Sequence, residues 1–137
     1  MADNLKYDLR QRTLDFSVVV IKYGQTINQP IMRSIIDQLV RSTTSIGANY
    51  AEANNASSKT DFRNKIYIAK KECAETEYWL DILLQFDGKN DSLITMRKEA
   101  HELTMIFQKI VNSLRSNWSL DNWRFFKLKI VYWKLDY

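Results

Sequence analysis

The chain has 137 residues, 45% hydrophobic and 26% charged, which suits one soluble globular domain with a single core. Its one cysteine, Cys73, excludes an intramolecular disulfide and favours a cytoplasmic location. We also expect no signal peptide and no membrane span, because the first ten residues are polar and the longest apolar run covers only residues 16–21. The net charge is +4, but residues 1–114 carry only +1 and residues 115–137 carry +3, so bulk charge argues weakly for a nucleic-acid surface on the folded body.

Only three glycines and one proline interrupt the chain, so long periodic segments predict an all-helical protein. The first helix is expected over residues 5–27, with apolar positions at mostly helical spacing, among them Leu9, Phe16, Val19, Val20 and Tyr23. The second is expected over residues 28–54, with Asn28 as its N-cap and Pro30 in its first turn. Its apolar seam is predicted to contain Ile31, Ile35, Leu39 and Ile46.

The third helix is expected to begin after a capping Ser58 and to reach Phe86, with apolar residues every three or four positions. The fourth is expected to begin at Asp91 or Ser92 and to run to about residue 117. Short connections make neighbouring helices antiparallel. Residues 1–116 are therefore predicted to form an all-α, antiparallel up-down-up-down four-helix bundle.

Residues 117–137 form a different segment, which is aromatic and basic. It holds seven of the 17 aromatic residues of the chain, and Phe126, Leu128 and Ile130 alternate with Lys127 and Lys129. This alternation is typical of an extended strand rather than a helix. We interpret the segment as a C-terminal appendage outside the bundle, either docked on a neighbouring subunit or left mobile.

A row of polar residues follows one face of the second predicted helix. Gln38, Ser42, Ser45, Asn49 and Glu52 are spaced by four, three, four and three residues, which places them on one side of a helix. A buried polar group without a partner costs roughly 1–3 kcal/mol, so this face needs hydrogen-bond partners if it is buried.

Acidic residues on the third helix are the candidate partners of this face. We predict a polar network between helices or subunits that fixes register and assembly. Its residues are Gln38, Arg41, Ser45, Asn49, Glu52, Glu72 and Glu75. Solvated charges on a helix surface are the simpler alternative.

The residues give no sign of catalysis or metal binding. A di-metal site in a helical bundle needs Glu-x-x-His, but Lys98 stands three residues before His101, the only histidine. Cys73 lies on an apolar seam, where a small buried thiol is the simpler interpretation than a nucleophile. We therefore expect no catalytic residue, no metal and no cofactor.

Two groups of cations are candidates for contact with nucleic acid. One lies on the third helix (Arg63, Lys65, Lys70 and Lys71), and the other lies in the aromatic tail (Arg124, Lys127 and Lys129). Cations alternating with aromatic side chains suit single-stranded nucleic acid. Solvated surface, or a tail that contacts another subunit, is the alternative.

The second and third helices resemble a bacterial family of four-helix-bundle proteins, first noted as products of intervening sequences in 23S ribosomal RNA genes. The resemblance covers about residues 5–114. In the second helix it rests on Gln38-Leu39-Val40-Arg41-Ser42, Ser45-Ile46-Gly47-Ala48-Asn49 and Ala51-Glu52. In the third it rests on Phe62, Lys65, Ile68-Ala69-Lys70-Lys71-Glu72-Cys73, Glu75 and Tyr78-Trp79-Leu80. The family often has Asn-x-x-Glu-Gly, whereas Ala53 stands in place of the glycine here.

The resemblance implies an antiparallel bundle that assembles as a ring of identical subunits, a homopentamer above other states. The accessory protein of diversity-generating retroelements resembles this family in architecture, and it works with a reverse transcriptase and binds nucleic acid. The implied partners are therefore the chain itself, RNA or DNA, and a reverse transcriptase or a ribosomal component. The resulting hypothesis is a non-enzymatic ring that binds nucleic acid or ribonucleoprotein through a basic surface. The alternative is a structural or protein-interaction scaffold with no nucleic-acid role.

Overall fold

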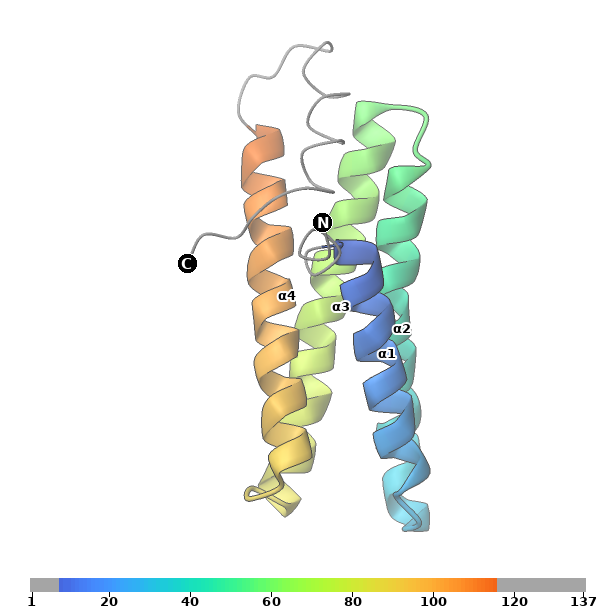
Figure 1. Ribbon diagram of the computed structural model, residues 1–137, viewed down its shortest axis with the longest axis vertical. Coiled ribbons are helices and arrows are strands. Elements are labelled where there is room, and N and C mark those ends of the chain that lie inside the picture. The colour runs from blue at the N-terminus through green and yellow to red at the C-terminus, as the bar shows by residue number, and fades with distance from the viewer. Residues whose placement is uncertain (1–7, 116–137) are drawn as a thin grey trace, which may run out of the picture.

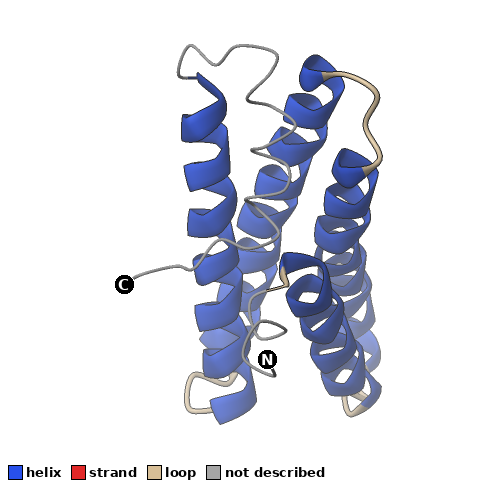
Figure 2. Cartoon of the chain, turned by 45° about the horizontal axis from the view of Figure 1, so that its top comes forward, coloured by secondary structure: helices blue, strands red, loops and turns tan. Residues whose placement is uncertain are grey.

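The computed structural model describes residues 8–115, which form four α-helices lying side by side (Figure 1). They are α1 (Leu9–Gln25), α2 (Arg33–Asn54), α3 (Lys59–Phe86) and α4 (Asp91–Arg115), and a short 3-10 helix, η2 (Pro30–Met32), precedes α2. Within these residues every regular element is a helix, and consecutive helices run antiparallel (Figure 2). The predicted all-α four-helix bundle is confirmed.

The two ends of the bundle differ. The connections α1–α2 and α3–α4 lie at one end, here called the α3–α4 end, and the connection α2–α3 lies at the other, the α2–α3 end (Figure 1). Helix α1 begins part-way along the bundle, so α2, α3 and α4 extend beyond it toward the α2–α3 end (Figure 1). Within residues 8–115, none of the helices is both long and apolar enough to cross a membrane.

The core runs along the inside of all four helices. An edge-to-face contact between Tyr50 and Phe107, with ring centroids 6.0 Å apart, joins α2 to α4. The largest fully buried side chains include Leu39, Tyr50, Phe62, Leu80, Leu103 and Phe107. Buried residues recur every three or four positions along α3, as at Phe62, Ile66, Ala69 and Cys73, which explains why periodicity predicted the bundle.

Small side chains bring α1 and α2 close together. A Cβ atom built on Gly47 would lie 3.0 Å from Thr13 Oγ1 and 3.3 Å from Thr13 Cβ. One turn further on, the Ser17 hydroxyl lies 3.4 Å from the Thr43 carbonyl oxygen. This junction contains no ion pair among the described residues, and close backbone approach takes the place of charge.

The predicted starts of α3 and α4 are confirmed. The Ser58 side chain accepts a hydrogen bond from the Asp61 backbone N–H at 3.1 Å, and α3 ends at Phe86 as expected. Helix α4 begins at Asp91, after the Asn90 side chain accepts a hydrogen bond from the Leu93 N–H at 3.1 Å. Both are N-cap bonds, which satisfy donors that the first turn leaves unpaired.

The predicted start of the second helix is wrong. Pro30 opens η2, and α2 begins only at Arg33, so Asn28 is not its N-cap. Ile31 was expected in the apolar seam, yet it is 81% exposed because η2 turns it outward before the α-helical period begins. Val19 is also outside the core, 50% exposed on α1, because its neighbours Phe16 and Val20 occupy the inward face.

The first predicted helix is shorter than expected at its C-terminus, ending at Gln25 rather than at residue 27. It also begins at Leu9 rather than at the expected residue 5, because the Asp8 side chain caps it by accepting a hydrogen bond from the Arg10 N–H at 2.9 Å. The domain boundary at residue 116, and the aromatic appendage of residues 117–137, lie outside the described residues.

Candidate functional site

The polar face of α2 lies against α3, where one part of it is buried. The Ser42 hydroxyl is fully buried and donates to the Leu39 carbonyl oxygen at 3.1 Å. It accepts a hydrogen bond from the Thr76 hydroxyl of α3 at 2.9 Å. These two bonds supply the partners that a buried serine requires.

Arg41 is the centre of the charged part of this α2–α3 junction. Its guanidinium forms an ion pair with Glu75, lies 3.8 Å from a Glu72 oxygen and donates to the Gln38 side chain at 3.2 Å. The Trp79 indole N–H donates to the same Glu75 carboxylate at 3.2 Å. The structure therefore brings Gln38, Arg41, Glu72 and Glu75 together at one place.

The other three residues of the predicted network are arranged differently. The Ser45 hydroxyl donates to the Arg41 carbonyl oxygen at 2.7 Å, and the Asn49 amide donates to the Ser45 carbonyl oxygen at 2.8 Å. Both bonds stay within α2. Glu52 forms an ion pair of 2.5 Å with Lys65 of α3. Whether any of these seven residues controls assembly stays a prediction.

Glu72 is the least well satisfied of the acidic residues. Its Oε2 atom is buried and has no hydrogen-bond partner among the described residues. Burial raises the pKa of the Glu72 carboxyl, the neighbouring Glu75 raises it further, and Arg41 and Lys71 oppose the shift. A raised pKa means that burial near another carboxylate outweighs the attraction of the two cations.

Two more arginine clusters join the other helices. Arg12 of α1 donates to both Glu99 oxygens at 2.7 and 2.9 Å and to Glu102 at 2.7 Å on α4. Its hydrogen bond to Glu99 is the largest cause of its raised pKa, so Arg12 stays charged.

The α3–α4 junction has the second cluster. Arg97 pairs with Glu77 at 2.9 Å and with Asp81 at 2.7 Å, and His101 lies 2.8 Å from Glu77. Arg12 and Arg97 were not among the site residues predicted from the sequence. Each arginine nevertheless had a sequence signal, which is a pair of carboxylates one helical turn apart on another helix. The pair is Glu99 and Glu102 for Arg12, and Glu77 and Asp81 for Arg97.

The four cations predicted on the third helix do not form one surface. Arg63 and Lys70 lie on the side that faces α4, together with Tyr67. Lys65 turns toward α2 and Glu52, and Lys71 is exposed on a further side. The tail candidates Arg124, Lys127 and Lys129 lie outside the described residues.

Cys73 is fully buried, and burial above all raises the pKa of its thiol far above the usual range. Residues 8–115 contain no group of three or more His, Cys, Asp or Glu side chains that could hold a metal ion.

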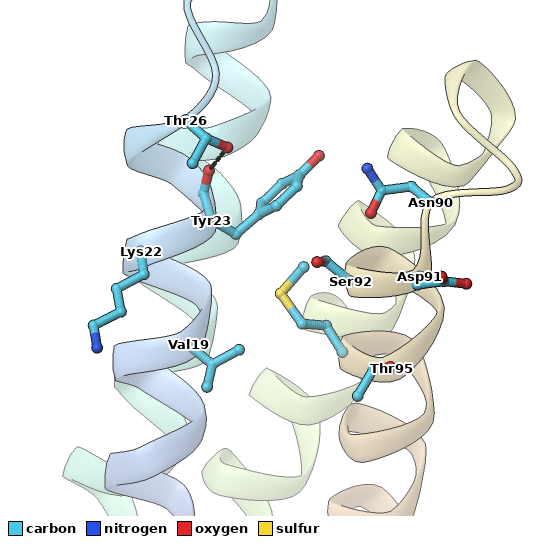
Figure 3. A pocket seen from close by; sticks show the side chains of 9 residues that line it. Val19, Lys22, Tyr23, Thr26, Asn90, Asp91, Ser92 and Thr95 are labelled. Atoms are coloured by element: carbon cyan, nitrogen blue, oxygen red, sulfur yellow. Dashed lines mark hydrogen bonds between the residues drawn. The ribbon is translucent and has the colours of Figure 1, made fainter.

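An open groove of about 590 Å³ separates α1 from α4 near the α3–α4 end. Figure 3 shows Tyr23 pointing from α1 across this groove toward Asn90, while Lys22 points away from it. A second pocket of about 490 Å³ lies next to Tyr23 and is lined mainly by apolar side chains such as Ile27, Met32 and Phe86. Neither hollow gathers a set of convergent charged groups.

Known proteins similar to this chain come from the 23S rRNA-intervening sequence protein family and the S23 ribosomal protein family. Residues 6–116 match the family described as 23S rRNA-intervening sequence protein. A crystal structure of a protein of unknown function from the S23 ribosomal protein family of Bacteroides thetaiotaomicron is 33% identical to this chain, with a TM-score of 0.69. The match covers 74% of this chain and 96% of the other. No curated protein matches the chain.

Proposed function

Because the chain belongs to the family of 23S rRNA-intervening sequence proteins, we propose that it is a non-enzymatic protein that assembles into a ring and binds nucleic acid or ribonucleoprotein through a basic surface. A ring of five identical subunits in the cytoplasm is the form proposed. The ligand class is RNA or DNA, alone or together with a reverse transcriptase or a ribosomal component.

One observation carries the assembly part of this proposal. Leu14, Val18 and Ile21 are spaced by four and three residues on the outer side of α1, and they are 43%, 40% and 39% exposed. We call these three residues the α1 stripe. Helix α1 is thus apolar on its inner face and on part of its outer face, which is typical of a helix that packs against other elements on both faces. We propose that a second copy of the chain packs against the α1 stripe.

The proposal that the protein binds nucleic acid is supported by three cations, Arg63, Lys70 and Arg115, which lie along the α3–α4 junction near Tyr67. We would measure the binding of fluorescent RNA and DNA oligonucleotides by anisotropy between about 50 and 200 mM salt. A nucleic-acid ligand should give a linear fall of log affinity with log salt concentration, because bound phosphates release counterions.

A scaffold with no nucleic-acid role is the second candidate, and one observation favours it. Arg12, Arg41, Lys65 and Arg97 are all engaged by carboxylates of neighbouring helices, which leaves fewer cations for an external ligand. A stable oligomer that binds no oligonucleotide at low salt would establish this alternative and overturn the nucleic-acid proposal.

Assembly is tested by native mass measurements on the full chain and on a chain ending at Leu114, at low and high salt. A pentamer that persists in all four conditions would support assembly through the bundle. A monomer, or an oligomer that needs residues beyond 114, would overturn it.

A further inference from the structure

Charge is strongly segregated along the α3–α4 hairpin. Residues 62–71 and 103–115 contain six basic residues and no acidic residue, a net charge of +6. The first three residues of α3, 59–61, add one basic and one acidic residue, whereas residues 72–102 contain eight acidic and three basic residues, a net charge of −5. The small net charge of the folded body therefore conceals a basic α2–α3 end and an acidic α3–α4 end.

One face of α3 shows this change of sign directly. Arg63, Tyr67 and Lys70 follow each other at steps of four and three, so they share a side of the helix. Arg115 of α4 reaches that side, since its Nε and Nη2 atoms donate to the Tyr67 hydroxyl at 3.1 and 2.9 Å. Its guanidinium carbon also lies 5.9 Å from the centre of the Tyr67 ring.

The same face becomes acidic further along α3. Glu77 and Asp81 continue the row about two and three turns beyond Lys70, and there Arg97 of α4 is paired with both. Within residues 8–115, neither Arg63 nor Lys70 forms an ion pair with a carboxylate, and both are at least partly exposed.

The acids nearest to this basic surface face other directions. Glu52 of α2 is paired with Lys65, on a different side of α3. Asp61 stands two residues before Arg63, which on a helix of 3.6 residues per turn places it on the opposite side. Arg63, Lys70 and Arg115 are therefore a set of cations without an intervening carboxylate, and we call them the basic end.

We propose that the basic end is the surface that binds the phosphate backbone of a nucleic-acid strand, an inference that rests on the proposed function and assigns its site. Guanidinium groups match phosphate geometry with paired N–H donors, and Arg115 is held in place by Tyr67. Contacts to phosphates carry no sequence information, so the binding is sequence-independent. The acidic stretch beyond Lys70 repels a strand, which confines the site to the α2–α3 end.

The test removes the same number of charges from each end of the full chain. One variant is Arg63→Gln/Lys70→Gln/Arg115→Gln. The matched control is Lys22→Gln/Lys89→Gln/Lys98→Gln, three exposed lysines away from the basic end. A third variant, Arg124→Gln/Lys127→Gln/Lys129→Gln, tests the tail. Each is titrated with single-stranded RNA, single-stranded DNA and duplex DNA of one sequence.

The basic-end variant is expected to lose at least about tenfold in affinity and to lower the salt slope by about 2, at roughly 0.7 per phosphate on a single strand. The control should change the affinity by less than about threefold, as expected for cations away from the phosphates. Unchanged native mass and melting temperature in all three variants would show that folding and assembly are intact.

The outcomes separate this inference from the function on which it rests. Equal losses in the basic-end and control variants, or a loss confined to the tail variant, would overturn the basic end as the site and leave nucleic-acid binding in place. No binding by the unaltered chain at low salt would overturn both. Comparison of the three oligonucleotides identifies which source of phosphate the surface accepts.

Discussion

Gly47 sets the distance between α1 and α2, since a Cβ atom at this position would press on Thr13. Alanine normally stabilises a helix interior by roughly 0.5–1 kcal/mol relative to glycine. Thr13 is fully enclosed, and its hydroxyl is bonded to the Arg10 carbonyl oxygen at 2.9 Å, so it has little room to move. We expect Gly47→Ala to destabilise the protein by about 1 kcal/mol or more in urea denaturation.

The neighbouring position supplies the control. Ala48 is exposed on α2, so Ala48→Gly should cost about 1 kcal/mol through helix propensity alone. The cost of Gly47→Ala should become smaller in a Thr13→Ala background, which removes the shorter of the two contacts. Stabilisation by Gly47→Ala in the unaltered chain would show that α1 moves away without penalty.

Glu72 should give the protein a pH dependence of unusual sign for a carboxylate. Folding raises its pKa above the ordinary value of 4.5, chiefly through burial, so the folded state holds this proton more tightly than the unfolded state. Protonation of Glu72 therefore favours folding. Its favourable contribution is complete below the unfolded pKa and is lost as the pH rises through the folded pKa.

The measurement compares the unaltered chain with Glu72→Gln by urea denaturation near about pH 7 and about pH 5. Relative to the variant, the unaltered chain should gain stability on acidification, by less than about 1 kcal/mol because the cluster is partly open to water. Parallel pH profiles for the two proteins would contradict a raised pKa at Glu72.

Residue spacing predicted which side chains share a face, but not what each of them bonds to. Gln38, Arg41, Glu72 and Glu75 do meet, because the α2 and α3 faces are adjacent. Ser45 and Asn49 occupy the same face and bond instead to carbonyl oxygens four residues back in α2. Short polar side chains have this local alternative within a helix, and spacing cannot distinguish it from a contact across helices.

At the scale of helices, the starts of α3 and α4 were predicted, whereas the capping role of Asp8 at the start of α1 was not. Ser58 and Asn90 cap the first turns of α3 and α4, and both helices begin where expected. The start of α2 was mispredicted because Pro30 is compatible with the first turn of an α-helix and of a 3-10 helix alike. Local sequence does not separate these two cases.

Helix α1 depends on one arginine for its charged contact with α4. Removing Arg12 would leave Glu99 and Glu102 as neighbouring like charges without their shared cation. We expect Arg12→Ala to destabilise the protein by about 1–2 kcal/mol, since the cluster is half-buried and hydrogen-bonded. Hydrogen exchange should become faster in α1 and change little in the middle of α3.

The control for this prediction is Arg10→Ala, because Arg10 lies on the same helix and is exposed. It should leave the exchange of α1 unchanged apart from the first turn. Equal acceleration in both variants would mean that α1 is held by its apolar face alone, and that the arginine cluster contributes nothing measurable.

At the scale of the whole molecule, the fold class followed from periodicity, few breakers and short connections. The distribution of charge over the folded protein could not be predicted from these features. Residues 1–114 carry a net charge of only +1, which suggested a neutral body, yet the α3–α4 hairpin is basic at one end and acidic at the other. This asymmetry becomes visible only when the antiparallel pairing places residues 62–71 beside residues 103–115.

Self-assembly through the α1 stripe is the last prediction. Val18 lies in the middle of the stripe, so Val18→Glu would place a charge where the proposed contact excludes water, at a cost of several kcal/mol if it is buried unpaired. Native mass should fall to the monomer, or the concentration for half-dissociation should rise at least about tenfold, a change of about 1.4 kcal/mol. Circular dichroism should stay helical, because Val18 is 40% exposed in the single chain.

Ile94→Glu is the matched control, since Ile94 is 48% exposed on α4 and lies outside the stripe. It makes the same change in charge and hydropathy on a different side of the bundle, so its native mass should equal that of the unaltered chain. A lower mass in both variants would indicate a general effect of added negative charge. An unchanged mass for Val18→Glu would place the contact between subunits elsewhere on the bundle and leave the α1 stripe exposed in the assembled protein.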